Sequence, residues 1–188
     1  MNVLVIDCEY NQLNDNPKTI QIGAAAYKAK TGELLGEFET FIDPNECIVP
    51  RITELTGITT ADVSGAPNIR EAYEELQRFA QKHKCFKNPL LWGAGTSNDS
   101  AHIYQEAYPT KELQKEHHNF MGRRVIDVKS IWQSIQIHNN DTVKGGLVAV
   151  CDKIGIGFEG NAHTALADAK NTFRVWYFLV KQFPQRFR

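Results

Sequence analysis

Hydrophobic residues recur along the chain at two spacings, one typical of strands and the other of helices. Val3 to Ile6 form a short continuous apolar run that ends in acidic residues, a pattern typical of a buried central strand. Residues 19–27 and 34–42 are two further strand candidates. The Lys30-Thr31-Gly32-Glu33 segment between them has the residues of a tight turn, so these two strands are expected to form a hairpin.

The rest of the chain alternates helical and strand patterns. Asn68 and Glu71 have the spacing of a capping box, which opens an amphipathic helix that runs to about His83. Short apolar runs at 90–92 and 125–127 predict two more strands. One helix is expected to begin at about residue 99, and another to follow the strand at 125–127 and end at residue 137. Further helices are expected over 143–154 and 164–182, with short helical turns over 50–62. Three early strands followed by this alternation predict an α/β fold with helices packed on a mixed sheet.

Size and composition are those of a soluble globular protein. The 188 residues suit one domain, 1–188, with a sizeable core. Hydrophobic residues make up 42% and charged residues 23%, and no apolar run approaches the ~20 residues that span a bilayer. Since the amino terminus lacks the basic region of a signal peptide, we expect a cytoplasmic protein with no membrane partner. The four cysteines form no C-x-x-C pair, which argues against a zinc site and a disulfide framework.

Two carboxylates stand at the end of the first expected strand. Side chains at i and i+2 of a strand project from the same face, so Asp7 and Glu9 are expected to point together. Carboxylates held this close repel each other unless a cation or a proton lies between them. An isolated D-x-E sequence is nevertheless more often a solvated strand end than a site, because short motifs match by chance. The pair therefore needs support from elsewhere in the chain.

His163 and Asp168 supply that support. Asp168 falls in a stretch rich in Ala and Leu, where a charged residue needs a reason to face the core. At ~100° per residue, the steps from His163 to Asp168 rotate by roughly 500°, so the two would not share a face of one continuous helix. They converge if His163 lies in the loop before the helix, where its imidazole can take a proton from water. A histidine in the first helical turn and a solvent-facing aspartate are the alternative.

A further carboxylate has two candidates. Asp99 follows the strand over 90–92 and begins the next helix, a position that suits a metal ligand and an ordinary N-cap equally well. Asp127 also follows a short strand. We favour Asp99, because Gly93 and Gly95 leave room for a substrate backbone beside it.

Together these side chains specify a reaction better than any of them alone. Four carboxylates from three regions of the chain are hard oxygen ligands, which suit two Mg²⁺ or Mn²⁺ ions. Two such ions stabilise the attacking and leaving oxygens of a phosphodiester, and His163 would be the general base. The carboxylates are Asp7, Glu9, Asp99 and Asp168.

On these motifs the chain resembles the DEDDh exonuclease superfamily over nearly its whole length. Residues 5–9 (VIDCE) are similar to the family's first motif, residues 21–24 (QIGA) to its second strand and residues 155–169 (GIGFEGNAHTALADA) to its third motif. Residues 50–59 (PRITELTGIT) are similar to the segment after the family's third strand. The resemblance implies a ribonuclease H-like fold, with a mixed five-stranded sheet flanked by helices. It also implies the catalytic residues Asp7, Glu9, Asp99, His163 and Asp168, with the four carboxylates as metal ligands.

The resemblance further implies contacts to the terminal nucleotides from the first motif and the L-T-G-I segment, at Cys8, Tyr10, Leu55 and Ile58. Core packing is the competing interpretation for Leu55 and Ile58. The second motif departs from the family, since Asn98 precedes Asp99 where many members have an aromatic residue. Trp92-Gly93 is similar to a variant found among RNA-trimming members.

The expected function is metal-dependent 3′→5′ exonuclease activity on the 3′ end of single-stranded RNA or DNA, with RNA slightly favoured. The products would be nucleoside 5′-monophosphates. A net charge of −1 argues against a protein that grips many phosphates, but suits one that holds a strand end with bound cations. Arg123-Arg124 and the tail from Lys181 to Arg188 are candidate phosphate contacts, with a solvated surface as the alternative. A non-catalytic nucleic-acid-binding module and a glycosidase with paired carboxylates are the other functions considered.

Overall fold

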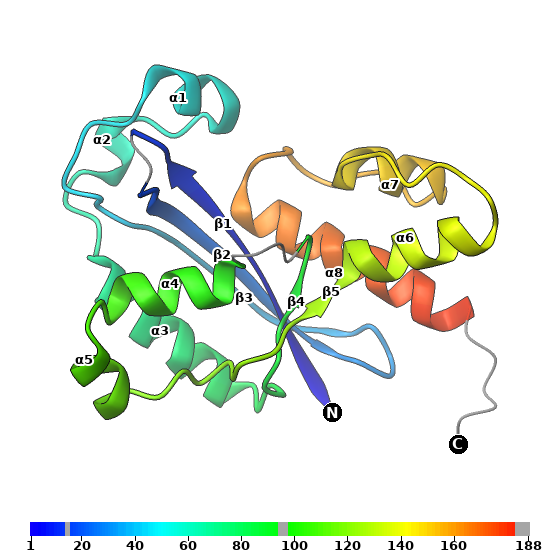
Figure 1. Cartoon of the computed structure of the whole chain (residues 1–188), viewed down its shortest axis with the longest axis horizontal. Coiled ribbons are helices and arrows are strands. Elements are labelled where there is room, and N and C mark those ends of the chain that lie inside the picture. The colour runs from blue at the N-terminus through cyan, green and yellow to red at the C-terminus, as the bar shows by residue number, and fades with distance from the viewer. Residues whose placement is uncertain (14–15, 94–97, 183–188) are drawn as a thin grey trace.

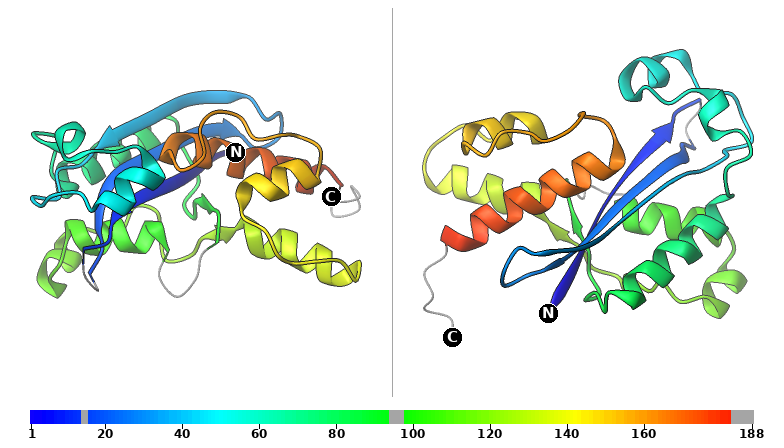
Figure 2. Two further views of the ribbon diagram at one scale, coloured as in Figure 1. Left: turned by 90° about the horizontal axis from the view of Figure 1, so that it is seen from above. Right: turned by 180° about the vertical axis from the view of Figure 1, so that it is seen from behind.

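A five-stranded sheet forms the centre of the protein, with helices on both of its faces (Figures 1 and 2). The computed structural model describes residues 1–13, 16–93 and 98–182. The strand order is β3-β2-β1-β4-β5; β1, β2 and β3 are antiparallel neighbours, while β4 and β5 run parallel to β1. The strands are β1 (Asn2–Asn11), β2 (Lys18–Lys28), β3 (Leu34–Phe41), β4 (Leu90–Leu91) and β5 (Ile126–Asp127). The mixed five-stranded sheet and the hairpin of β2 and β3 are therefore as predicted.

The helices follow the expected order with two differences. They are α1 (Pro50–Thr56), α2 (Thr60–Val63), α3 (Ile69–Lys82), α4 (Asp99–Ala107), α5 (Lys111–Glu116), α6 (Val128–His138), α7 (Leu147–Lys153) and α8 (Ala165–Gln182). The predicted capping box of α3 is present, with Asn68 and Glu71 each bonded to the other's backbone. The helix predicted over 143–154 begins only at Leu147, because Gly145 has a φ of 138° and Gly146 is the N-cap. Helix α5 was not predicted. Gly95 and residues 183–188 lie outside the described residues.

Successive residues of β1 point into two different cores. Leu4, Ile6 and Cys8 pack with α3 and α4 on one face of the sheet. Val3 and Val5 pack on the other face with α6, α7 and α8. All three tryptophans belong to this second core: Trp132 is fully buried, and Trp92 and Trp176 pack against the cluster as partly buried side chains.

The unequal lengths of β1 and β4 leave room for a site. The described part of β4 has two residues and meets β1 only at the Val5–Leu90 pair. The carboxyl-terminal half of β1 therefore runs past the end of β4, and the amino-terminal end of α4 lies beside it (Figure 1). In the parts of the chain that are described, no helix has both the length and the apolar character to cross a membrane.

Candidate active site

Asp7 and Glu9 lie on the same face of β1, as predicted. They continue the alternation of Val3 and Val5, so they project toward the face that α8 covers. Across the ladder, Asp7 is opposite Gly23 of β2. This pairing brings the residues of the Q-I-G-A segment next to the first motif.

Gly23 and Gln21 of β2 hold the beginning of α8 against the sheet. A Cβ atom on Gly23 would lie 2.1 Å from the backbone nitrogen of Leu166, so only glycine allows this close approach. The buried Gln21 side chain accepts a hydrogen bond of 3.0 Å from the backbone N–H of Ala165, one of the amides that a helix start leaves without an internal partner. These two contacts fix the first turn of α8, and thus Asp168, beside β1.

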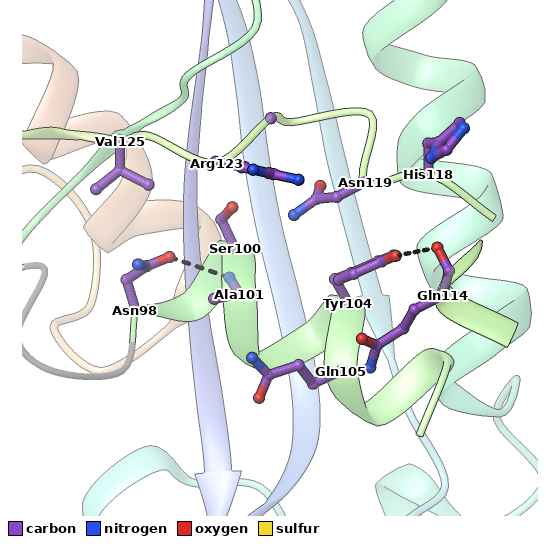
Figure 3. A pocket seen from close by; sticks show the side chains of 11 residues that line it. Asn98, Ser100, Ala101, Tyr104, Gln105, Gln114, His118, Asn119, Arg123 and Val125 are labelled. Atoms are coloured by element: carbon purple, nitrogen blue, oxygen red, sulfur yellow. Dashed lines mark hydrogen bonds between the residues drawn. The ribbon is translucent and has the colours of Figure 1, made fainter. Parts of the chain in front are cut away.

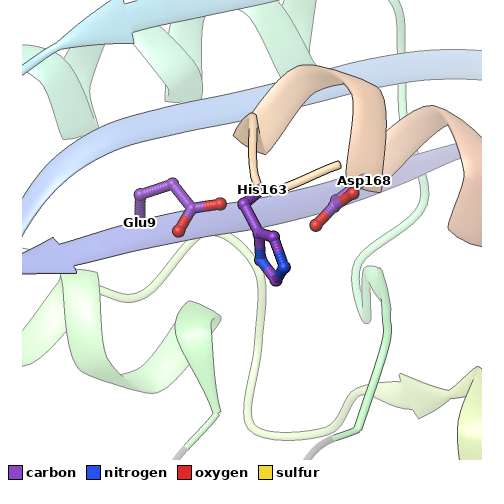
Figure 4. A group of neighbouring side chains, drawn as sticks. All are labelled: Glu9, His163 and Asp168. Carbon is purple, nitrogen blue, oxygen red and sulfur yellow. The ribbon is translucent and has the colours of Figure 1, made fainter. Parts of the chain in front are cut away.

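His163 lies in the loop that precedes α8, where the sequence required it. Its backbone is left-handed, with a φ of 63°, and its side chain is exposed. The imidazole ring lies between the side chains of Glu9 and Asp168 (Figure 4). One potential ligand atom from each of the three residues lies within 4.8 Å of the other two. Strand β1, the loop and α8 therefore bring these three side chains together from distant parts of the chain.

Asp99 belongs to the same cluster, and Asp127 does not. The N-cap of α4 is Asn98, whose side chain accepts from the backbone N–H of Ala101 at 3.0 Å. The interpretation of Asp99 as a cap was therefore wrong, and its carboxylate is left for another role. Asp127 instead caps α6 by accepting from the backbone N–H of Ser130 at 3.1 Å, and it also accepts from the N–H of Gly93.

Burial raises the pKa of all four carboxylates, and neighbouring carboxylates raise that of Asp7 and Glu9 further. Burial, and then the charges of Asp99, Asp168 and Glu9, raise the pKa of Asp7 well above its ordinary value. Burial, followed by Asp168 and Asp99, raises the pKa of Glu9 to about 7. Burial also raises the pKa of Asp99 and of Asp168. Four carboxylates from three segments thus share one poorly solvated space, which favours either bound protons or bound cations.

The arrangement fits a divalent cation. Asp168 Oδ1 is buried and has no hydrogen-bond partner among the described residues. A buried acceptor without a donor costs about 1–3 kcal/mol, a penalty that a cation in contact with it would remove. Carboxylate oxygens are the ligands that Mg²⁺ and Mn²⁺ prefer. Asp7, Glu9, Asp99 and Asp168 are the residues that would hold such ions.

The four predicted substrate contacts occupy different environments. Leu55 of α1 is 51% exposed, whereas Ile58 is 5% exposed and packs with Ile20, so the core interpretation holds for Ile58. Cys8 is 7% exposed and lies in the core shared with α3, so its side chain offers little surface for a substrate contact. The hydroxyl of Tyr10 donates to Asp99 Oδ1 at 2.7 Å.

A cavity of 530 Å³ opens beside the cluster and was not predicted. His163 and Asp168 line one side of it, and Trp92 and the amino-terminal end of α7, including Leu147, line the rest. In the sequence, this part of the cavity wall is indicated only by the Gly145-Gly146 pair, after which α7 begins at Leu147. The cavity therefore opens directly next to the carboxylates.

Comparison with known proteins assigns the chain to a family. Residues 4–176 match a family model described as Exonuclease (RNase_T). The chain belongs to this exonuclease family. The match runs from β1 into α8 and so includes all the clustered side chains. It confirms the resemblance to DEDDh exonucleases that the motifs indicated.

Curated relatives are much longer proteins. The chain is 31% identical over 170 residues to the DNA polymerase III PolC-type of Clostridium perfringens, which covers 90% of this chain and 10% of the relative. It is 27% identical over 184 residues to the same polymerase of Streptococcus mutans, covering 97% of this chain and 11% of the relative. The chain thus spans about a tenth of the length of the curated relatives it matches.

Solved structures of nucleases share the fold. The nuclease domain of 3′hExo, a DEDDh family member bound to rAMP, aligns with a TM-score of 0.74 and 16% identity over 96% of this chain and 92% of that one. S. pombe Pop2p, in its Mg²⁺- and Mn²⁺-bound form, aligns with a TM-score of 0.71 and 18% identity over 96% and 83%. Exonuclease X in complex with 5′ overhanging duplex DNA aligns with a TM-score of 0.65 and 14% identity over 95% and 91%. The predicted ribonuclease H-like fold is confirmed.

Proposed function

We propose that this domain is a metal-dependent 3′→5′ exonuclease that removes nucleoside 5′-monophosphates from the 3′ end of single-stranded nucleic acid. The observation that carries the proposal is the cluster itself. Asp7, Glu9, Asp99 and Asp168 share one space, and His163 reaches it from an exposed loop. Surplus negative charge on four hard oxygen ligands calls for two divalent cations, Mg²⁺ or Mn²⁺.

In the proposed hydrolysis, His163 acts as the general base. His163 removes a proton from the attacking water, because its ring lies at the edge of the cluster and has access to solvent. The water oxygen forms a bond to phosphorus, the bond to the 3′ oxygen of the preceding nucleotide breaks, and that oxygen takes up a proton. When bound, the two divalent ions stabilise the charge on the attacking and leaving oxygens.

Some observations favour DNA as the substrate and others favour RNA. The curated relatives are DNA polymerases of the PolC type, which favours DNA, whereas Trp92-Gly93 favours RNA slightly. Among the proteins of similar fold, one was solved in 3′-end specific recognition of a histone mRNA stem-loop and another with DNA. Matched ribo- and deoxyribo-oligonucleotides, compared on the wild-type chain, decide between them. The cytoplasmic location stays a prediction.

The experiment follows shortening of an oligonucleotide labelled at its 5′ end, with Mg²⁺ or Mn²⁺ and with EDTA as a control. We expect single-nucleotide shortening, loss of activity in EDTA and a background rate for Asp99→Asn. Asp127→Asn is the matched control, because asparagine caps a helix as well as aspartate does. It should keep its activity. Equal loss in both variants would overturn the assignment of Asp99.

His163→Asn tests the general base. Asparagine tolerates the left-handed backbone that His163 adopts, so the loop is expected to keep its shape. The rate should fall by about 10²- to 10⁴-fold, while binding of Mn²⁺ and of the oligonucleotide is retained. Activity that survives this change, or that persists in EDTA, would contradict the mechanism. A chain that binds oligonucleotides but never shortens them would instead be a non-catalytic binding module.

A further inference from the structure

A second cavity, of 570 Å³, lies along the outer side of α4 and carries no role in the proposed reaction. Its walls are α4, the neighbouring end of α5 and residues 118–125 (Figure 3). The side chains that matter for its chemistry are those of Asn98, Gln105, His118, Asn119 and Arg123. We call this cavity the α4 groove.

Two asparagines of the α4 groove present hydrogen-bond donors, because the protein itself uses their oxygens as acceptors. Asn98 Oδ1 accepts from the backbone N–H of Ala101 at 3.0 Å. Asn119 Oδ1 accepts from the Tyr73 hydroxyl at 3.1 Å and from the backbone N–H of Met121 at 3.0 Å. These backbone donors fix which atom of each amide is the oxygen. Within the described part of the chain neither NH₂ group has a hydrogen-bond acceptor, so both remain to serve a ligand. In Figure 3 the nitrogen of Asn119 points along the groove, on the same side as Arg123.

The charge of the α4 groove is opposite to that of the active site. None of its lining residues is an aspartate or a glutamate. Arg123 is exposed and has no carboxylate within ion-pair distance in the described part of the chain. Unused amide donors together with a guanidinium match the oxygens of phosphate groups.

The α4 groove begins one residue from a member of the catalytic cluster. Asn98 lines the groove, and the next residue is Asp99. From Asn98 to Gln105 the helix rises by about 10 Å. At ~3.4 Å for each stacked nucleotide, this is the length of about three nucleotides.

We propose that the α4 groove binds the phosphodiester backbone of a single-stranded nucleic acid upstream of the 3′ end, with Arg123 and the amides of Asn98 and Asn119 as phosphate contacts. The proposal rests on the proposed function, since it assumes that the 3′ end lies at the carboxylate cluster. It assigns a role to one of the two adjacent arginines. Arg124 does not line the groove.

Arg123→Ala and Arg124→Ala form a matched pair that tests the groove. Binding of a trimer and of a 12-mer is measured by fluorescence anisotropy over a range of salt concentrations, in Ca²⁺ to limit hydrolysis. For Arg123→Ala we expect a Kd about tenfold higher for the 12-mer, an unchanged Kd for the trimer, and a slope of log Kd against log salt reduced by about 0.7. Arg124→Ala should match the wild type. Equal effects of the two variants, or equal effects on both lengths, would overturn the proposal.

Asn119→Asp is a second test that preserves the fold. The new carboxylate keeps an oxygen for Tyr73 and Met121, but it replaces the NH₂ donor with a negative charge. The 12-mer should bind more weakly and the trimer as before; unchanged binding of the 12-mer would count against the groove. Failure of the proposed function is seen separately. If the wild-type chain binds the 12-mer more tightly than the trimer but never shortens it in Mg²⁺, the groove proposal stands and the proposed exonuclease function fails.

Discussion

The Tyr10 hydroxyl donates a 2.7 Å hydrogen bond to Asp99 Oδ1 and so joins the end of β1 to the first turn of α4. A register shift between Glu9 and Tyr10 lies at this point of the ladder, and bulges of this kind redirect side chains. The rings of Tyr10 and His102 of α4 pack in a T-shaped arrangement, with 4.9 Å between the ring centroids. Two of the three segments that carry the carboxylates are thus tied together directly. Tyr10 was predicted to contact substrate, but its hydroxyl is used within the protein.

A second set of contacts connects α4 to β2. Glu106, one turn after His102 on α4, lies 3.6 Å from the His102 ring nitrogen and accepts a 2.6 Å hydrogen bond from the Thr19 hydroxyl. Thr19 is the ladder partner of Tyr10. The position of α4, and with it the carboxylate of Asp99, is therefore set from both β1 and β2.

Tyr10→Phe should weaken metal binding, because Asp99 loses the hydrogen bond that orients it. Loss of an outer hydrogen bond to a metal ligand typically reduces affinity by about 10- to 100-fold. Titration calorimetry with Mn²⁺ measures the change without any need for nuclease activity. Tyr108→Phe, which removes a hydroxyl at the far end of α4, is the control and should bind Mn²⁺ like the wild type. A raised KM for the oligonucleotide with unchanged Mn²⁺ affinity would instead make Tyr10 a substrate contact.

Leu55 and Ile58 should respond to substitution in opposite ways. Leu55→Ala removes an exposed side chain, so the free energy of unfolding should change by less than about 0.5 kcal/mol while the KM for the oligonucleotide rises. Ile58→Ala leaves a hole in a buried cluster and should cost about 2–5 kcal/mol. Urea denaturation and steady-state kinetics on the same preparations measure both effects. A Leu55→Ala variant with unchanged KM would remove Leu55 from the substrate site.

Gly23→Ala should destabilise the protein, because its methyl group would overlap the backbone of α8 at Leu166. Overpacking of this kind costs about 1–3 kcal/mol or more. Gly146→Ala is the matched control: its φ is −80°, and a Cβ there would meet nothing within 4 Å. Thermal unfolding compares the two. Equal melting temperatures would show that α8 can shift without cost, contrary to the close approach described above.

The stability of the metal-free protein should fall as the pH rises. The folded-state pKa of Glu9 is about 7, above its ordinary value of 4.5, and that of Asp7 is also raised. Between these pH values the folded state binds more protons than the unfolded state, so the free energy of unfolding decreases from about pH 4.5 to about pH 7. Mg²⁺ competes with those protons and should raise the melting temperature more at pH 8 than at pH 5.

Melting curves in EDTA and in Mg²⁺ at the two pH values measure this effect. Glu9→Gln supplies the control, since it removes one of the charges and should flatten the pH dependence. A metal-free protein that is more stable at pH 8 than at pH 5 would mean that the carboxylates are not held together as described.

By itself, the amino-acid sequence determined most of the elements and named the candidate residues of the site. The alternation in β1 placed Asp7 and Glu9 on one face, and the capping box of α3 was readable from two residues. The rotation between His163 and Asp168 required a loop, which the left-handed His163 provides. These features depend on the chain's local periodicity and backbone preferences, which short stretches of sequence encode.

Only the tertiary structure decided which side chains converge. Asp99 and Asp127 both follow short strands, and locally they are equivalent; packing of α4 against Tyr10 brings one into the cluster, while the other caps α6. Leu55 and Ile58 stand in one short segment, yet only Ile58 reaches the core. These outcomes depend on contacts between residues far apart in the chain, whose energies no local pattern contains.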